Sequence, residues 1–177
     1  RDGEHLIKTL IANYILEGIY FYSGFMFFYN LGRMGKMPGS VQEIRYINRD
    51  ENTHLWLFRS ILLELKKEEP QLFTPEHIEI YKGMLKHGVE EEIKWAEYVL
   101  GERMEGLTME MVADYIHYLG NLRSNALGFG SLYDGYEKEP ASMEWVSMYS
   151  NANIIKTDFF EAKSTAYAKS SALVDDL

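Results

Sequence analysis

The sequence predicts an all-α protein, a bundle of helices without a β-sheet. Apolar residues recur at helical spacing in several long segments, and no segment alternates apolar and polar residues as a half-buried strand does. Clusters of glycine and proline separate these segments. With 177 residues, 46% of them hydrophobic and 14% aromatic, the chain is large enough for one domain with a sizeable core.

The first helix is expected from about Glu4 to Leu31, and a glycine-rich loop at residues 32–39 ends it. This helix is apolar on nearly every side, with one acid, Glu17, in its middle. Helical spacing is expected to place Glu17 on the same face as four aromatic residues, which are Tyr14, Phe21, Phe25 and Phe28.

The second helix is expected to start with Ser40 as its cap and to end before Pro70. One stripe of this helix, with alternating steps of three and four residues, is expected to point into the core. The stripe consists of Ile44, Ile47, Glu51, His54, Phe58, Ile61 and Leu65. A carboxylate and an imidazole therefore lie among apolar side chains.

Two further helices are expected with hydroxyl caps. The third starts at Thr74, followed by Pro75 and Glu76, and the fourth starts at Thr108 and ends near Gly128. A loop at residues 128–140 and a short helix at about 141–151 should follow. Small and polar residues dominate from Asp158 onward, which predicts a helical domain at 1–157 and a C-terminal tail at 158–177.

Glu17, Glu51 and His54 are the candidate metal ligands, since a buried charge needs a strong partner and a metal ion is the most economical one. Two other interpretations of Glu17 remain open, a transmembrane helix and a protonated core acid bonded to a tyrosine. Glu51 and His54 could instead form a buried ion pair between helices. Bundles that bind two metals use two helices with one Glu each and two with Glu-x-x-His. This chain offers half of that set.

Two other polar groups compete as candidates. Asp114 and His117 are three residues apart, but we expect them on the solvated face of the fourth helix, opposite an apolar face that includes Leu122. The acids at 90–92 are expected to form a solvated charge run with lysine partners one turn away.

Composition narrows the possible functions. The formal net charge of −9 argues against a nucleic-acid surface. The absence of cysteine excludes disulfides and thiolate ligands, and it leaves oxygen and nitrogen donors. These donors suit iron or manganese, although ligand softness alone does not exclude zinc. No secretory leader is recognised, so we expect a cytoplasmic protein without a membrane partner.

The chain resembles the C-terminal half of the radical-generating small subunit of class I ribonucleotide reductase. Two segments in matching order carry the resemblance, a run from Ile15 to Phe25 around Glu17, then Ile44-x-x-Ile47-x-Arg49-Asp50-Glu51-x-x-His54. Later stretches at 90–98 and 115–123, and the ending Phe159-Phe160-Glu161 with Tyr167, also fit. The resemblance implies a ferritin-like helical bundle and covers essentially the whole chain.

The resemblance implies a role for each matching residue. Glu17, Glu51 and His54 match ligands of a dinuclear site, with Glu51 and His54 on the same metal. Phe21 and Phe25 match the aromatic pocket beside it. Asp50 matches an acid that orients a ligand histidine from the other half of the family sequence, although it could be a surface acid paired with Arg49 or His54. Tyr167 matches the tail tyrosine that passes the radical to the large subunit, and Glu161 the tail acid near that step.

The family pattern also contains an Asp, a second Glu-x-x-His and the radical store, all absent from these residues. The first residue is not Met. We therefore expect one part of a divided small subunit, or a fragment of a longer chain, and we favour a divided protein that reassembles with an N-terminal half.

The implied cofactor is a dinuclear iron, Mn/Fe or Mn/Mn centre, oxidised by dioxygen or a related oxidant. The implied partners are that N-terminal half, a second copy of the reassembled subunit and the large catalytic subunit. Two alternatives are a related dimetal ligand-binding oxidase, which has no use for the tail, and a non-catalytic helical scaffold.

Overall fold

The computed structural model describes residues 2–150, and in this range the all-α prediction is confirmed. The α-helices are α1 (Asp2–Ile15), α2 (Tyr22–Arg33), α3 (Pro38–Glu68), α4 (Pro75–Val99), α5 (Met109–Ala126) and α6 (Glu144–Ser150). A π-helical segment, η1 (Leu16–Tyr20), lies between α1 and α2, and short 3-10 turns precede or follow the others at Pro70–Phe73, Gly101–Arg103 and Ala141–Met143. The expected boundary between domain and tail at 157/158 lies outside the described residues.

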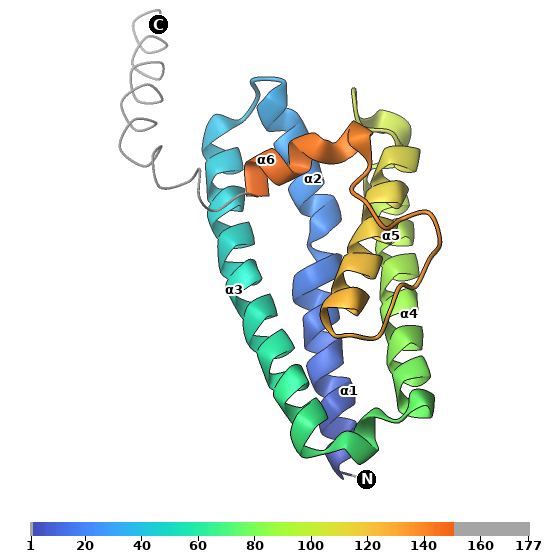
Figure 1. Ribbon diagram of the computed structural model, residues 1–177. Coiled ribbons are helices and arrows are strands. Elements are labelled where there is room, and N and C mark those ends of the chain that lie inside the picture. Colours follow the sequence, from blue (N-terminus) through green and yellow to red (C-terminus); the bar gives the residue numbers. More distant parts are fainter. Residues whose placement is uncertain (1, 151–177) are drawn as a thin grey trace, which may run out of the picture.

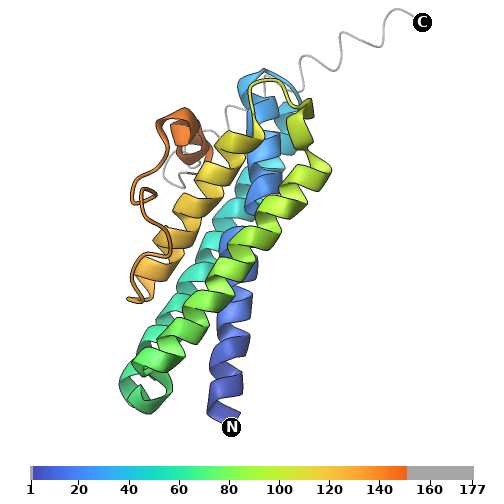
Figure 2. The same cartoon turned by 90° about the vertical axis from the view of Figure 1, so that its right-hand side faces the viewer.

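The long helices run roughly side by side in one elongated bundle (Figures 1 and 2). Helices α1 and α2 form one column that is interrupted at η1, and α3 packs against both of them. Helices α4 and α5 pack closely on each other at the other side of that column. Helix α6 crosses one end of the bundle near α2 and α3. The interrupted column is therefore central, in contact with α3, α4 and α5.

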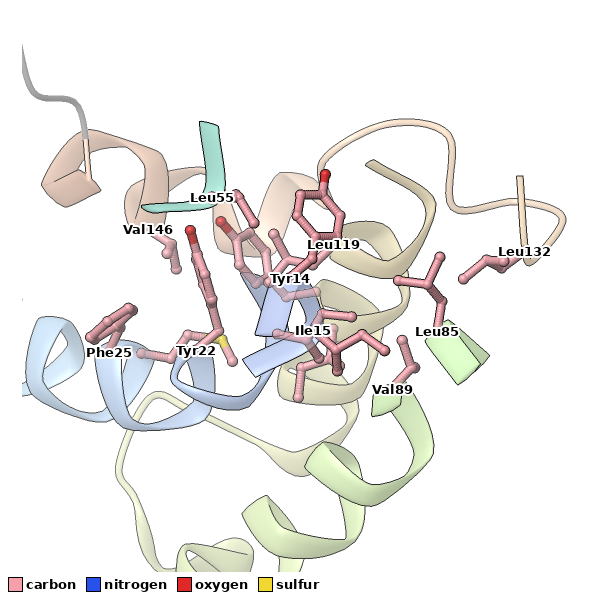
Figure 3. Packing of buried hydrophobic residues seen from close by; sticks show 14 of the residues in the cluster. Tyr14, Ile15, Tyr22, Phe25, Leu55, Leu85, Val89, Leu119, Leu132 and Val146 are labelled. Carbon is pink, nitrogen blue, oxygen red and sulfur yellow. The ribbon is translucent and has the colours of Figure 1, made fainter. Parts of the chain in front are cut away.

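The core is formed by apolar and aromatic side chains from every long helix (Figure 3). Its largest fully buried members include Tyr14, Met26, Leu62, Leu85 and Ile116. None of the helices in the described part of the chain has an apolar stretch long enough to span a membrane. The transmembrane interpretation of the first helix is thus not supported, and this helix is a core element because its apolar surface packs on other helices.

Two of the three expected hydroxyl caps are confirmed. The Thr74 hydroxyl accepts from the His77 backbone N–H at 3.4 Å, and the Thr108 hydroxyl accepts from that of Met111 at 3.2 Å. The Ser40 cap was wrong. Helix α3 begins at Pro38 after Met37, which has a left-handed backbone with φ of 49°. Proline suits the first turn because it needs no N–H partner there, so the helix starts before the serine.

The first helix is not continuous, contrary to expectation. The π-helical segment η1 adds a residue to the turn and shifts the register of all later side chains. Of the four aromatic residues, Tyr14 before the interruption and Phe25 after it are buried, Phe28 is half-buried and Phe21 is exposed. Spacing within an ideal helix could not predict this, because an ideal helix contains no π-helical turn.

The inward stripe predicted for α3 was also wrong within the described residues. The buried residues of this helix repeat every seven positions, at Val41, Asn48, Leu55 and Leu62. The predicted stripe lies along the edge of that interface, where its members alternate between half-buried and exposed. The stripe contains both apolar residues and the candidate ligands, and the other helices within residues 2–150 bury it only in part.

Close packing of α1 against α4 depends on a glycine. A Cβ built on Gly88 would lie 2.6 Å from Ile15 Cγ2, whereas one built on Gly83 of the same helix would meet nothing within 4 Å. Gly88→Ala should therefore lower the free energy of unfolding by about 1–3 kcal/mol through overpacking. Gly83→Ala should raise it by up to about 1 kcal/mol, because alanine favours the helix. Urea unfolding of the two variants measures both effects, and equal effects would contradict this account of the contact.

Candidate metal centre

Three candidate ligands come together from two elements. Glu17 lies in η1, the interruption of the central column, while Glu51 and His54 lie one turn apart on α3. Their ligand atoms all lie within 4.8 Å of one another. Within residues 2–150, this is the one group of three or more acidic, histidine or cysteine side chains close enough to hold a metal ion.

The contacts within the group are incomplete. His54 Nδ1 lies 2.8 Å from Glu51 Oε2 and 3.8 Å from Glu17 Oε2. The side chains of Glu17 and Glu51 are 15% and 17% exposed, and that of His54 is 53% exposed. Glu17 Oε2 is buried without a hydrogen-bond partner. A buried carboxylate oxygen normally has a partner, so this atom indicates that a ligand belongs here.

The electrostatics of Glu17, Glu51 and His54 also favour a bound cation. Burial, and then the neighbouring Glu51 carboxylate, raise the pKa of Glu17 to about 7. The hydrogen bond and charge of Glu51 raise the pKa of His54. Two carboxylates forced together repel each other, and a divalent cation would remove this repulsion. Two carboxylates and one imidazole form a donor set that fits iron or manganese, although they leave most coordination positions unfilled.

The other residues expected near the site are in different surroundings. Phe25 is buried and Phe21 is 36% exposed, with ring centroids 6.2 Å apart. Asp50 is exposed and accepts from Arg49 Nε at 3.0 Å and Nη2 at 2.9 Å. This is the surface pairing that the sequence left open as an alternative. Tyr167 and Glu161 lie outside the described residues.

Comparison with known proteins identifies the family. The family model described as "Ribonucleotide reductase, small chain" matches residues 1–140. The chain is 72% identical over 172 residues to the ribonucleoside-diphosphate reductase subunit beta of Treponema pallidum, covering 97% of this chain and 49% of that protein. The chain belongs to the ribonucleotide reductase small-chain family. It is 40% identical over 166 residues to the subunit beta of Halalkalibacterium halodurans, with 94% and 48% coverage.

A solved structure of the same family has the same fold. The ribonucleotide reductase R2 subunit from Clostridium botulinum superposes with a TM-score of 0.76 at 50% identity, over 80% of this chain and 44% of that one. The expected ferritin-like helical bundle is thereby confirmed. This small-chain family member spans about half the length of the curated relatives that it matches.

One of the two competing polar groups, Asp114 with His117, was placed wrongly from the sequence. Asp114 and His117 are half-buried rather than solvated, because the loop after α5 folds back on them. Asp114 accepts from the Tyr136 hydroxyl at 3.4 Å, and the His117 ring contacts Tyr133 and Tyr136. Leu122, expected in the core, is 40% exposed.

Sequence reasoning also missed two buried charged residues next to η1. Glu92 is 2% exposed, although it lies in the acidic run expected to be solvated, and only Glu91 of that run has the expected lysine partner, Lys94 at 2.8 Å. Arg123 is 9% exposed and was not singled out. Spacing gave a usable signal for Glu92, because it is one turn from the buried Val89 and Ala96.

Proposed function

We propose that this chain is the C-terminal part of a ribonucleoside-diphosphate reductase small subunit, whose metal centre generates the radical that the large subunit uses to make deoxyribonucleotides. The observation that supports this best is the convergence of Glu17, Glu51 and His54 around the unpartnered Glu17 Oε2. These residues would bind one side of a dinuclear iron or manganese centre. When bound, such a centre supplies the oxidising equivalent from which the radical is made.

Each nearby residue has a defined part in this proposal. Glu51 and His54 would share one metal, and Glu17 would lie beside them on the central column. Phe21 and Phe25 would keep water from the centre. Asp50 would orient a histidine ligand of the N-terminal half, which requires it to leave Arg49 in the assembled protein. Tyr167 and Glu161, in the proposed tail at 158–177, would carry the oxidising equivalent toward the large subunit.

An exposed apolar surface supports the need for an N-terminal half. Exposed apolar side chains lie on α1, on α3 and at the residue that joins η1 to α2. We call this set the open face, and it consists of Leu6, Phe21, Ile47, Leu57 and Ile61, which are each 36–49% exposed. Several exposed apolar side chains on and next to the elements that carry an incomplete site are typical of an interface. The relatives contain another half of comparable length, and we propose that this half covers the open face.

One competing function, a non-catalytic helical scaffold, is less consistent with these observations. A purely structural polar network should satisfy its buried atoms, and the unpartnered Glu17 Oε2 does not fit one. A dimetal oxidase would use the same ligands but no radical partner. The proposed cellular setting is the cytoplasm, with a homodimer of the reassembled subunit.

Reassembly with the N-terminal half tests this proposal. Produced alone, the chain should associate through its open face and bind metal weakly, whereas co-production with the N-terminal half should add two metals per subunit and raise the melting temperature. Calorimetry measures the melting temperature, and metal analysis measures the number of metals per subunit. Ile61→Glu should weaken the pairing, while His87→Glu, an exposed position on α4, should not. A cooperative, monomeric isolated chain that gains neither metal nor stability would contradict the proposal.

A further inference from the structure

The interruption in the central column is held by two buried charged side chains from other helices. Ser23 donates its backbone N–H to Oε1 of Glu92, a residue of α4, at 3.0 Å. The Gly18 carbonyl accepts from Nε of Arg123, a residue of α5, at 3.2 Å. Gly18 and Ser23 are five residues apart, and a carbonyl and an N–H at that separation would pair with each other in a longer π-helix. Instead, each has a side-chain partner.

Neighbouring side chains position Arg123, and a glycine leaves room for its guanidinium group. Arg123 Nη2 donates to the Tyr22 hydroxyl at 3.0 Å, and the Tyr14 hydroxyl donates to the Arg123 carbonyl at 3.3 Å. A Cβ on Gly18 would lie 3.0 Å from Arg123 Nε and 2.8 Å from Leu55 Cδ1. A glycine at this position therefore allows the guanidinium to reach the backbone one residue after Glu17.

These two residues are expensive to bury. Within residues 2–150, neither Glu92 nor Arg123 takes part in an ion pair, although both are at least nine-tenths buried. Burial raises the pKa of Glu92 to about 7, and Oε1 accepts the Ser23 N–H in either protonation state. Charged groups buried without an opposite charge reduce stability, so packing alone does not account for them. Both residues contact the backbone near Tyr20, Arg123 at Gly18 before it and Glu92 at Ser23 after it.

We infer that Glu92 and Arg123 are positioning residues that together fix the interruption between α1 and α2, and thereby the place of the Glu17 carboxylate. Without them, the Gly18 carbonyl and the Ser23 N–H would lose these partners, so that the register at Leu16–Tyr20 would no longer be fixed and Glu17 would be free to rotate away from Glu51 and His54. The backbone part of this inference stands on the contacts alone. The part that concerns metal affinity rests on the proposed function.

Two acid substitutions separate the hydrogen bond from the charge. Glu92→Gln keeps a carbonyl oxygen that can accept from Ser23, whereas Glu92→Asp keeps the charge but is too short by one methylene. Hydrogen exchange at residues 16–24 should be about as slow in Glu92→Gln as in the unchanged protein, and at least about tenfold faster in Glu92→Asp. Arg123→Met should also speed exchange there. Glu90→Leu, an exposed change in the same acidic run, serves as the control and should leave it unchanged.

Metal affinity is measured on the same variants, co-produced with the N-terminal half. Mn²⁺ titration should show about 10- to 100-fold weaker binding in Glu92→Asp and Arg123→Met, as is typical when a supporting residue of a metal site is lost, with near-normal binding in Glu92→Gln. Equal exchange at 16–24 in all variants would overturn the inference. Faster exchange with unchanged Mn²⁺ affinity would overturn its link to Glu17. Absence of Mn²⁺ binding even in the unchanged protein would instead refute the proposed function, and the exchange data would still decide the backbone part.

Discussion

Replacing Glu51 or His54 by alanine should abolish metal binding at one position of the assembled centre. Both side chains extend from one turn of α3 toward Glu17, and each would supply a direct ligand to the same metal. Losing a residue that only supports a ligand typically costs 10- to 100-fold in affinity, so losing a ligand should cost about 100-fold or more. Metal analysis of the protein containing both halves should give one metal per subunit in place of two.

Matched substitutions away from the site provide the controls. Glu43→Ala changes an exposed acid on the same helix, and His87→Ala removes an exposed histidine on α4. Both should retain two metals. The ligand variants should keep the helical fold, because His54 is largely exposed and Glu51 lies at the edge of the α3 interface. Two metals per subunit in both Glu51→Ala and His54→Ala would refute the ligand assignment.

Tyr167→Phe should reduce deoxyribonucleotide formation with the large subunit to the background of the assay, while leaving the metal content unchanged. The substitution removes only a hydroxyl group. A phenol can lose its proton as the electron leaves, and phenylalanine has no such proton, so it cannot be oxidised at an accessible potential. Turnover assays measure the loss of activity. Metal analysis and the melting temperature measure whether the metal content and the fold are unchanged.

A second tyrosine shows whether the effect is specific. Tyr98 is 78% exposed on α4, and Tyr98→Phe should leave turnover near normal. If Tyr167→Phe also retained near-normal turnover, the relay role would be lost. The main ground for preferring a reductase to a dimetal oxidase would then be lost as well.

Local sequence signals correctly predicted the features that short-range interactions determine. The hydroxyl caps at Thr74 and Thr108 and the end of α3 before Pro70 depend on a few neighbouring residues, and all are present. The pairing of Glu51 with His54 follows from three-residue spacing on one helix, which needs no knowledge of other elements. The failed Ser40 cap is the exception, because proline two residues earlier already permits the helix to start.

The sequence by itself therefore determined the helical class, the Glu-x-x-His pair on α3 and the choice of Glu17 as its partner. Tertiary structure decided the surroundings of the break between α1 and α2, where Glu92 and Arg123, about 70 to 105 residues away in the sequence, bond the Ser23 N–H in α2 and the Gly18 carbonyl in η1. It also decided which stripe of α3 is buried. Helical spacing shows which side chains share a face, but the neighbouring helices determine which face is covered, and their contacts compete with the intrinsic register of the helix.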